Sequence, residues 1–192
     1  MENELAKSTA LAPMVPADHP TPGLYVASGP RLLPAWFLSA LCPALAHGTR
    51  LFWIDAGNRF DAYGAGSAAR ALGCDAKSVL RRVSLARPFN LFQLETMVCK
   101  KLPAQWRGEP VVMADPFPML YDEDVDIRDA RRVLTNVIRG MKALPAIWMI
   151  LNVERRAPKG RERWPQELIS QARGAAGLQP LGEKWELQEA PH

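Results

Sequence analysis

Two aspartates, Asp55 and Asp115, stand where short apolar segments end, at 50–55 and 110–115. A carboxylate at such a point can serve in two ways. It can hold a metal ion beside a bound phosphate, or it can accept hydrogen bonds from the N–H groups of the turn or helix that follows. Both roles stay open for both residues, and the structural one is the more common.

The densest basic segment of the chain, residues 155–164, is a second candidate site. Its five cationic residues and one tryptophan are Arg155, Arg156, Lys159, Arg161, Arg163 and Trp164. A proline and a glycine indicate a flexible loop, and closely spaced cations suit contacts with phosphates, while the tryptophan could stack on an exposed base. The alternative is a solvated surface loop whose tryptophan packs as an apolar anchor at the start of the next helix.

Short apolar runs alternate with helical patterns, and these elements must position the candidate residues. The predicted strands are 24–27, 50–55, 83–86, 110–115 and 147–153, and the predicted helices are 35–46, 62–72, 92–102, 128–144 and 165–176, followed by a possible hairpin over 178–187. This alternation predicts an α/β fold of three layers, with a mostly parallel central sheet and helices on both faces. Ligands of such sheets bind at the carboxyl ends of the strands, where Asp55, Asp115 and the turn after Ala27 lie.

The composition predicts one globular domain with a leader. Of the 192 residues, 48% are hydrophobic and 23% are charged, which is typical of a folded soluble protein. Residues 1–22 contain four prolines and no hydrophobic period. We therefore expect a flexible proline-rich leader at 1–22 and a single domain over 23–192. The formal net charge of +4 is a mild excess that would not repel an acidic partner.

The same composition predicts a cytoplasmic protein that does not contact a membrane. The three cysteines have no CxxC spacing and their number is odd, so we expect thiols in a reducing compartment and no metal site. The chain begins with the acidic stretch 1–4, no signal-peptide pattern follows, and the longest apolar stretch, 32–46, is too short to span a bilayer.

Four blocks of residues, in order along the chain, resemble the core of RecA/RadA-type recombinase ATPases. Segment 53–60 (WIDAGNRF) and segment 72–80 (LGCDAKSVL) are similar to the strand ending IDAE or IDTE and the GLDPEEVL-like segment of that family. Segment 83–90 (VSLARPFN) is similar to IYVARAFN, and 111–121 (VVMADPFPMLY) to the Walker B strand with its continuation VDSxxALF. Segment 146–153 resembles the next core strand, which ends TNQV. The resemblance runs from Gly23 to Val153 and implies a RecA-like domain of the P-loop NTPase superfamily.

The resemblance also implies which residues would bind ATP, and most of them are replaced. The phosphate cradle of the family is the Walker A motif G-x-x-x-x-G-K-[ST], and it corresponds here to residues 29–36. The positions that depart from the family pattern are Pro34 for the second glycine, Ala35 for the lysine, Trp36 for the hydroxyl residue and Gly57 for the catalytic glutamate. What remains is a degenerate nucleotide site consisting of Gly29, Arg31, Asp55 and Asp115, the last matching the Walker B aspartate.

We therefore expect a RecA-like protein that acts in DNA repair, recombination or the SOS response without hydrolysing ATP, and that needs neither ATP nor Mg²⁺. The expected partners are single-stranded DNA and a RecA-type recombinase or an error-prone polymerase. The basic segment is the candidate DNA site because it follows the strand that leads into the second DNA-binding loop of the family. Two alternatives stay open: an ATP-binding enzyme in which Arg31 replaces the lysine and Asp115 holds a metal ion, and a purely structural adaptor.

Overall fold

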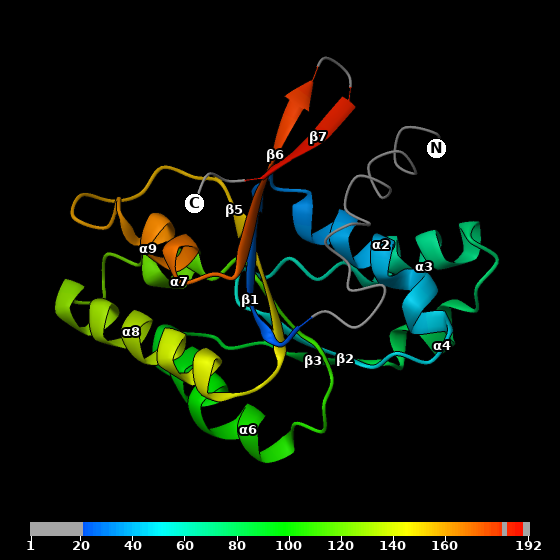
Figure 1. Ribbon diagram of the computed structural model, residues 1–192, viewed down its shortest axis with the longest axis horizontal. Helices are drawn as coiled ribbons and strands as arrows, with labels where there is room; N and C mark the ends of the chain where they lie inside the picture. Colours follow the sequence, from blue (N-terminus) through cyan, green and yellow to red (C-terminus); the bar gives the residue numbers. More distant parts are fainter. Residues whose placement is uncertain (1–20, 182–183, 190–192) are drawn as a thin grey trace.

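A computed structural model describes residues 21–181 and 184–189. The predicted leader, residues 1–22, lies almost wholly outside these described residues. Strands and helices alternate along the rest of the chain around one central sheet (Figure 1). No helix in the described part of the chain is long and apolar enough to cross a bilayer.

Within the described residues the sheet has seven strands, in the order β3-β2-β4-β5-β1-β6-β7. The strands are β1 (Gly23–Gly29), β2 (Leu51–Asp55), β3 (Val83–Ala86), β4 (Val111–Ala114), β5 (Ile147–Val153), β6 (Gly174–Leu181) and β7 (Lys184–Glu189). The first six strands in sequence are parallel, and β7 pairs antiparallel with β6. Every residue of β4 and all but the first of β5 are buried, as expected for central strands covered on both faces.

Helices cover both faces of the sheet, which confirms the predicted three-layer α/β fold (Figure 1). One face carries α2 (Leu33–Ala46), α3 (Ala62–Ala71) and α4 (Ala76–Leu80). The other face carries α5 (Leu91–Thr96), a π-helical turn (Met97–Lys101), α6 (Leu102–Gln105), α7 (Phe117–Leu120), α8 (Ile127–Ala143) and α9 (Trp164–Ser170). Each helical layer shares a separate hydrophobic core with the sheet face beneath it.

The longest helix, α8, forms where its apolar spacing predicts it. Its buried side is Ala130, Val133, Leu134, Val137, Ile138 and Met141. Asp126 caps the first turn by accepting a hydrogen bond from the N–H of Arg128 at 2.8 Å. The helix ends at Ala143, shortly before Pro145, which disfavours helical backbone in the residue preceding it.

The prediction of a helix over 165–176 is wrong in its second half. Helix α9 ends at Ser170, and residues from Gly174 onward form β6. The backbone of β6 pairs in register with β1, with Tyr25 opposite Gly174 and Ala27 opposite Ala176. Alanine and glycine carry no strand pattern of their own, so the pairing with β1 decides the conformation here.

Leu94 and Leu85 provide a matched test of the core beneath α5 and α8. Leu94 is 0% exposed, whereas Leu85 on the edge strand β3 is 45% exposed. We expect Leu94→Ala to lower the free energy of unfolding by about 2–5 kcal/mol, because it leaves a cavity in the core. Leu85→Ala should change it by less than about 0.5 kcal/mol. Urea denaturation of both variants measures this difference, and equal losses would contradict the described packing.

Candidate functional site

The carboxyl ends of β2 and β4 bring the two predicted aspartates to the same edge of the sheet. Asp55 is the last residue of β2 and pairs in register with Ala114, the last residue of β4. Asp115 follows directly. Both side chains are 0% exposed. Two buried carboxylates on neighbouring strands require compensating charge and hydrogen bonds, since burying an unpaired charge is costly.

Asp55 is held by one backbone N–H and one guanidinium group. Its Oδ1 accepts a hydrogen bond from the backbone N–H of Arg59 at 2.5 Å. Its Oδ2 accepts two from Arg87, from Nε at 3.0 Å and from Nη2 at 2.7 Å. The carboxylate therefore caps the turn after β2 and forms an ion pair with the residue that follows β3, so both of its oxygens are engaged.

Asp115 is held by two guanidinium groups. Arg59 Nε donates to Oδ2 at 3.0 Å, and Arg155 Nη2 donates to both carboxylate oxygens. The backbone of Asp115 is in the left-handed region (φ 54°), a conformation that aspartate and asparagine adopt more readily than most residues, and its N–H donates to Leu151 O at 2.8 Å. Because Arg59 contacts both aspartates, the three arginines and two aspartates form one connected cluster with a formal charge of +1.

This carboxylate–arginine cluster does not fit a magnesium ion. In the ATPases that the sequence resembles, the aspartate matched to Asp115 holds Mg²⁺, and Mg²⁺ requires free carboxylate or water oxygens. Here each oxygen of Asp55 and Asp115 already accepts at least one hydrogen bond, and a metal would have to displace Arg59 and Arg155. Among the residues that the structure describes, no group of three or more His, Cys, Asp or Glu side chains could hold a metal.

Gly57, at the position that corresponds to the catalytic glutamate, lies against Asp115. A Cβ atom on Gly57 would come within 2.4 Å of Asp115 Cβ and 2.6 Å of its Oδ2. Contacts this short do not occur in folded proteins, so any larger residue at 57 would force Asp115 to move. The present position of Asp115 therefore depends on glycine at position 57.

The turn after β1 is too short and too internally bonded to cradle a phosphate. Strand β1 ends at Gly29 and α2 begins at Leu33, so Pro34, Ala35 and Trp36 belong to the first helical turn instead of to a loop. Helix α2 begins earlier than the predicted residue 35 because proline suits the first turn of a helix. The N–H of Leu33 donates to Pro30 O at 2.9 Å, and that of Trp36 donates to Leu32 O at 3.0 Å.

The other residues assigned to the degenerate nucleotide site lie on or beside this turn. Gly29 is buried, and its carbonyl accepts a hydrogen bond from the N–H of Glu154 at 2.9 Å, which joins the turn to the start of the basic segment. Arg31 is exposed. The structure therefore brings Asp55 and Asp115 together in one cluster, whereas Arg31 lies at the surface and contacts neither of them.

The six predicted DNA-binding residues divide into an inner and an outer set. Arg155 contacts Asp115, as described above. Arg161 is 4% exposed and donates to the carbonyl oxygens of Leu120 (2.6 Å), Asp122 (2.7 Å) and Val125 (2.7 Å). Trp164 is also 4% exposed, with the Arg161 guanidinium 5.4 Å from its ring centre. These three inner residues fix both ends of the loop to the body of the protein.

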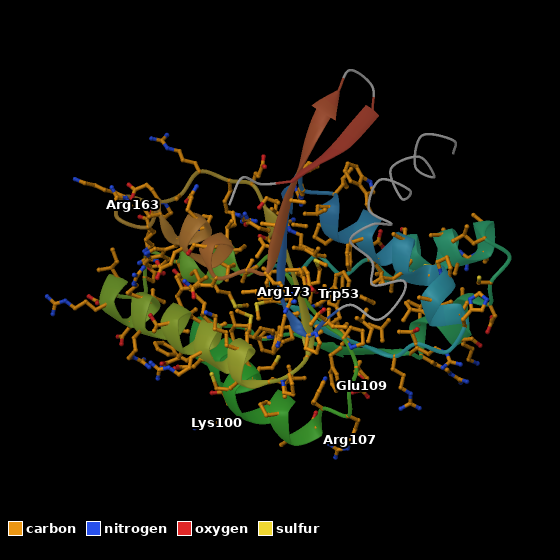
Figure 2. The ribbon with its side chains drawn as sticks, in the orientation of Figure 1. Trp53, Lys100, Arg107, Glu109, Arg163 and Arg173 are labelled. Carbon is orange, nitrogen blue, oxygen red and sulfur yellow. The ribbon has the colours of Figure 1, made fainter. Side chains whose placement is uncertain are left out.

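The outer set consists of Arg156, Lys159 and Arg163, all exposed. Figure 2 shows Arg163 at the periphery of the molecule near α9. The loop also carries Glu162, whose pKa is lowered by backbone hydrogen bonds to its own N–H and that of Gly160, so this side chain is ionised at neutral pH. Besides Arg155, which is itself exposed but paired with Asp115, the exposed part of the loop presents three cations and one anion on a backbone that is anchored at both ends.

Tyr121 is buried beside the end of the basic loop. Its ring packs 5.1 Å from Phe117 and 6.5 Å from Trp164, measured between ring centres. Burial raises the pKa of its hydroxyl to about 12, although the charge of Arg155 acts in the opposite direction. The hydroxyl is therefore neutral at physiological pH and cannot act as a general base there.

Arg59 and Arg87 were not predicted as site residues. Arg59 lies four residues after Asp55, and Arg87 directly follows β3, so each is close to the carboxyl end of a parallel strand. An arginine at such a position is a signal for an ion pair with a neighbouring strand-end aspartate. The sequence contained that signal, but it does not say which aspartate each arginine contacts.

Comparison with known proteins adds no further assignment. No protein-family model matches the chain, and no curated protein is similar to it at a significant level.

A substitution at Gly57 tests the contact with Asp115. We expect Gly57→Ala to lower the free energy of unfolding by about 1–3 kcal/mol, because the added methyl group overlaps the Asp115 side chain. Gly66→Ala, in α3, is the control: its Cβ would meet its nearest neighbours at 3.6 Å and 3.7 Å, and alanine favours a helix. Chemical denaturation measures both. A Gly57→Ala variant as stable as the wild type would mean that Asp115 is free to move.

Proposed function

We propose that this chain is a degenerate RecA-like protein that binds single-stranded DNA through the outer cations of its basic loop and does not hydrolyse ATP. It would act in DNA repair or recombination, alongside a RecA-type recombinase or an error-prone polymerase. The observation that carries the proposal is the contact between Arg155 and Asp115. The guanidinium takes the place that a metal would need, and the same residue holds the first part of the basic loop.

The sheet and the placement of the matched segments support the RecA-like part of the proposal. A parallel sheet covered by helices on both faces is compatible with a P-loop NTPase fold. The segments that resemble the recombinase core fall on or beside β2, β3, β4 and β5. Their strand-end residues Asp55 and Asp115 lie in one cluster. A nucleotide site that used both strand ends would require this proximity.

The anchoring of the loop supports binding that is independent of nucleotide. Arg155, Arg161 and Trp164 hold the loop against the body of the protein, so no ATP is needed to order it. A binding loop that is ordered beforehand loses less conformational entropy on association. Since Trp164 is buried, the available contacts are those of Arg156, Lys159 and Arg163 with phosphates, which predicts binding with little sequence preference.

A protein with this activity would work in the cytoplasm. All three cysteines of the chain are free thiols in the structure: Cys42 is buried, and Cys74 and Cys99 are half-buried. Burial raises the pKa of the Cys42 thiol to about 11, so it stays protonated and unreactive. Free thiols suit a reducing compartment.

Titration of a fluorescently labelled oligo(dT) with the full chain, followed by anisotropy, tests the proposed DNA site. We expect binding that weakens as salt rises and that does not change when Mg-ATP is added. In the variant Arg156→Ala/Lys159→Ala/Arg163→Ala, affinity should fall and the slope of log K against log salt should become shallower by about 2, given roughly 0.7 per phosphate contact.

The matched control is Lys100→Ala/Lys101→Ala/Arg107→Ala. It removes the same charge from exposed positions, and Figure 2 shows Lys100 and Arg107 on a different side of the molecule from Arg163. Its affinity should stay close to that of the wild type. An equal loss of affinity in both variants would mean that binding depends only on net charge. No binding at any salt concentration would favour the purely structural adaptor.

Thermal denaturation with and without Mg-ATP separates this proposal from an altered ATPase. A ligand at 100 times its Kd stabilises a protein by about 2.7 kcal/mol, which would raise the Tm of a chain this size by several degrees, at roughly 2–4 °C per kcal/mol. We expect no such rise, because the carboxylates are already paired. A rise that disappears in Asp115→Asn would establish the altered nucleotide site instead.

A further inference from the structure

A groove between α3 and α4 lies on the side of the sheet opposite the basic loop. Figure 1 shows α3 and α4 at one end of the molecule and α9, which follows the loop, at the other. The groove has a volume of about 490 Å³. A space of this size is large enough to receive one or two side chains of a bound peptide.

The floor of the groove is lined by small residues where α3 meets α4. Gly66 of α3 is buried and faces Ala76 of α4, and a Cβ on Gly66 would meet the Ala76 Cβ at 3.7 Å and Arg70 Nη1 at 3.6 Å. Leu80 completes the apolar lining and is half-buried. The two helices contact each other and still leave apolar surface accessible between them, which favours insertion of an apolar side chain.

The rim of the groove is basic. Arg70, Lys77 and Arg81 line it and are exposed, and none of the described residues that line it is acidic. No ion pair involves any of these three cations within the described part of the chain. Arg70 Nη2 donates to Ser67 Oγ at 3.1 Å, a neutral partner that leaves its charge uncompensated.

The acidic residues nearest in sequence are engaged in helix capping. Asp61 accepts a hydrogen bond from the N–H of Gly64 at 2.9 Å at the start of α3. Asp75 accepts hydrogen bonds from the N–H and the hydroxyl of Ser78, at 2.9 Å and 2.6 Å, at the start of α4, and these bonds lower its pKa. Neither carboxylate is part of the groove lining. The groove therefore has an apolar floor and a positive rim.

Tyr63 stands at the edge of the same groove and is 91% exposed. Burying a tyrosine ring while its hydroxyl stays solvated at the interface rim contributes favourable binding free energy. Tyrosine is also enriched among the residues that dominate the binding energy of protein interfaces. Tyr63 thus lies beside both the apolar floor and the three cations of the groove.

We propose that the groove between α3 and α4 binds an acidic peptide segment of a partner protein. One or two apolar side chains of that segment would occupy the space above Gly66 and Ala76. Its carboxylates would pair with Arg70, Lys77 and Arg81, and Tyr63 would cover its side. A nucleic acid would share the charge complementarity, and its bases could stack on Tyr63, but it has no aliphatic side chain to insert between α3 and α4. The inference does not depend on DNA binding by the loop.

Selection of binders from a displayed random peptide library, using the full chain as bait, tests the groove. Each selection is run against the wild type and against Gly66→Met, in which the longer side chain fills the floor. We expect the peptides enriched only by the wild type to contain Asp or Glu together with Leu, Ile, Phe or Met. No enrichment over Gly66→Met, or enriched peptides that lack either feature, would overturn the proposal.

Anisotropy of one labelled peptide from this selection then measures affinity. We expect a loss of at least about tenfold in Gly66→Met and in Arg70→Glu/Arg81→Glu, which changes only exposed side chains and so tests the groove even where Gly66→Met folds poorly. The loop variant Arg156→Ala/Lys159→Ala/Arg163→Ala should bind the peptide normally, which keeps this test separate from that of the DNA site. Loss of oligo(dT) binding in Arg70→Glu/Arg81→Glu, with peptide binding unchanged, would assign the groove to nucleic acid and overturn the peptide proposal.

Discussion

Two carboxylates with no exposed surface, Asp55 and Asp115, require positive charge at the carboxyl edge of the sheet. A buried carboxylate without a partner costs several kcal/mol even after the protein relaxes around it. Three arginines meet this requirement, and each comes from a different segment: Arg59 after β2, Arg87 after β3 and Arg155 after β5. The cluster therefore ties the ends of β2, β3, β4 and β5 to one another and fixes the beginning of the basic loop.

This internal compensation has a chemical consequence. A site that binds a metal–phosphate complex needs carboxylate oxygens that are free to coordinate the metal. In this protein the counter-charge comes from three arginines instead. Charge that is used inside the cluster is not presented to a ligand, so the loop contributes its remaining cations, Arg156, Lys159 and Arg163, to the outer surface. Within the basic segment, Arg155 and Arg161 therefore stabilise the fold, whereas Arg156, Lys159 and Arg163 face solvent.

The sequence was sufficient to predict the fold class and the position of the aspartates. Apolar runs covered on both faces predict buried strands, and α8 follows from its amphipathic spacing. The helix predicted over 165–176 fails at Gly174 because pairing with β1 decides that segment. The ion pairs could not be predicted, since Asp55–Arg87 and Asp115–Arg155 join residues 32 and 40 positions apart. Nor does composition show that Arg161 points inward while Arg163 points outward.

The close approach of Gly57 to Asp115 couples position 57 to the basic loop. A glutamate at position 57 collides with Asp115, Asp115 is held by Arg155, and release of Arg155 would loosen the basic loop. A larger residue at position 57 can therefore be accommodated only if Asp115, Arg155 and the start of the basic loop shift together. A change at position 57 is thus felt as far away as the surface loop, although the two are nearly 100 residues apart in sequence.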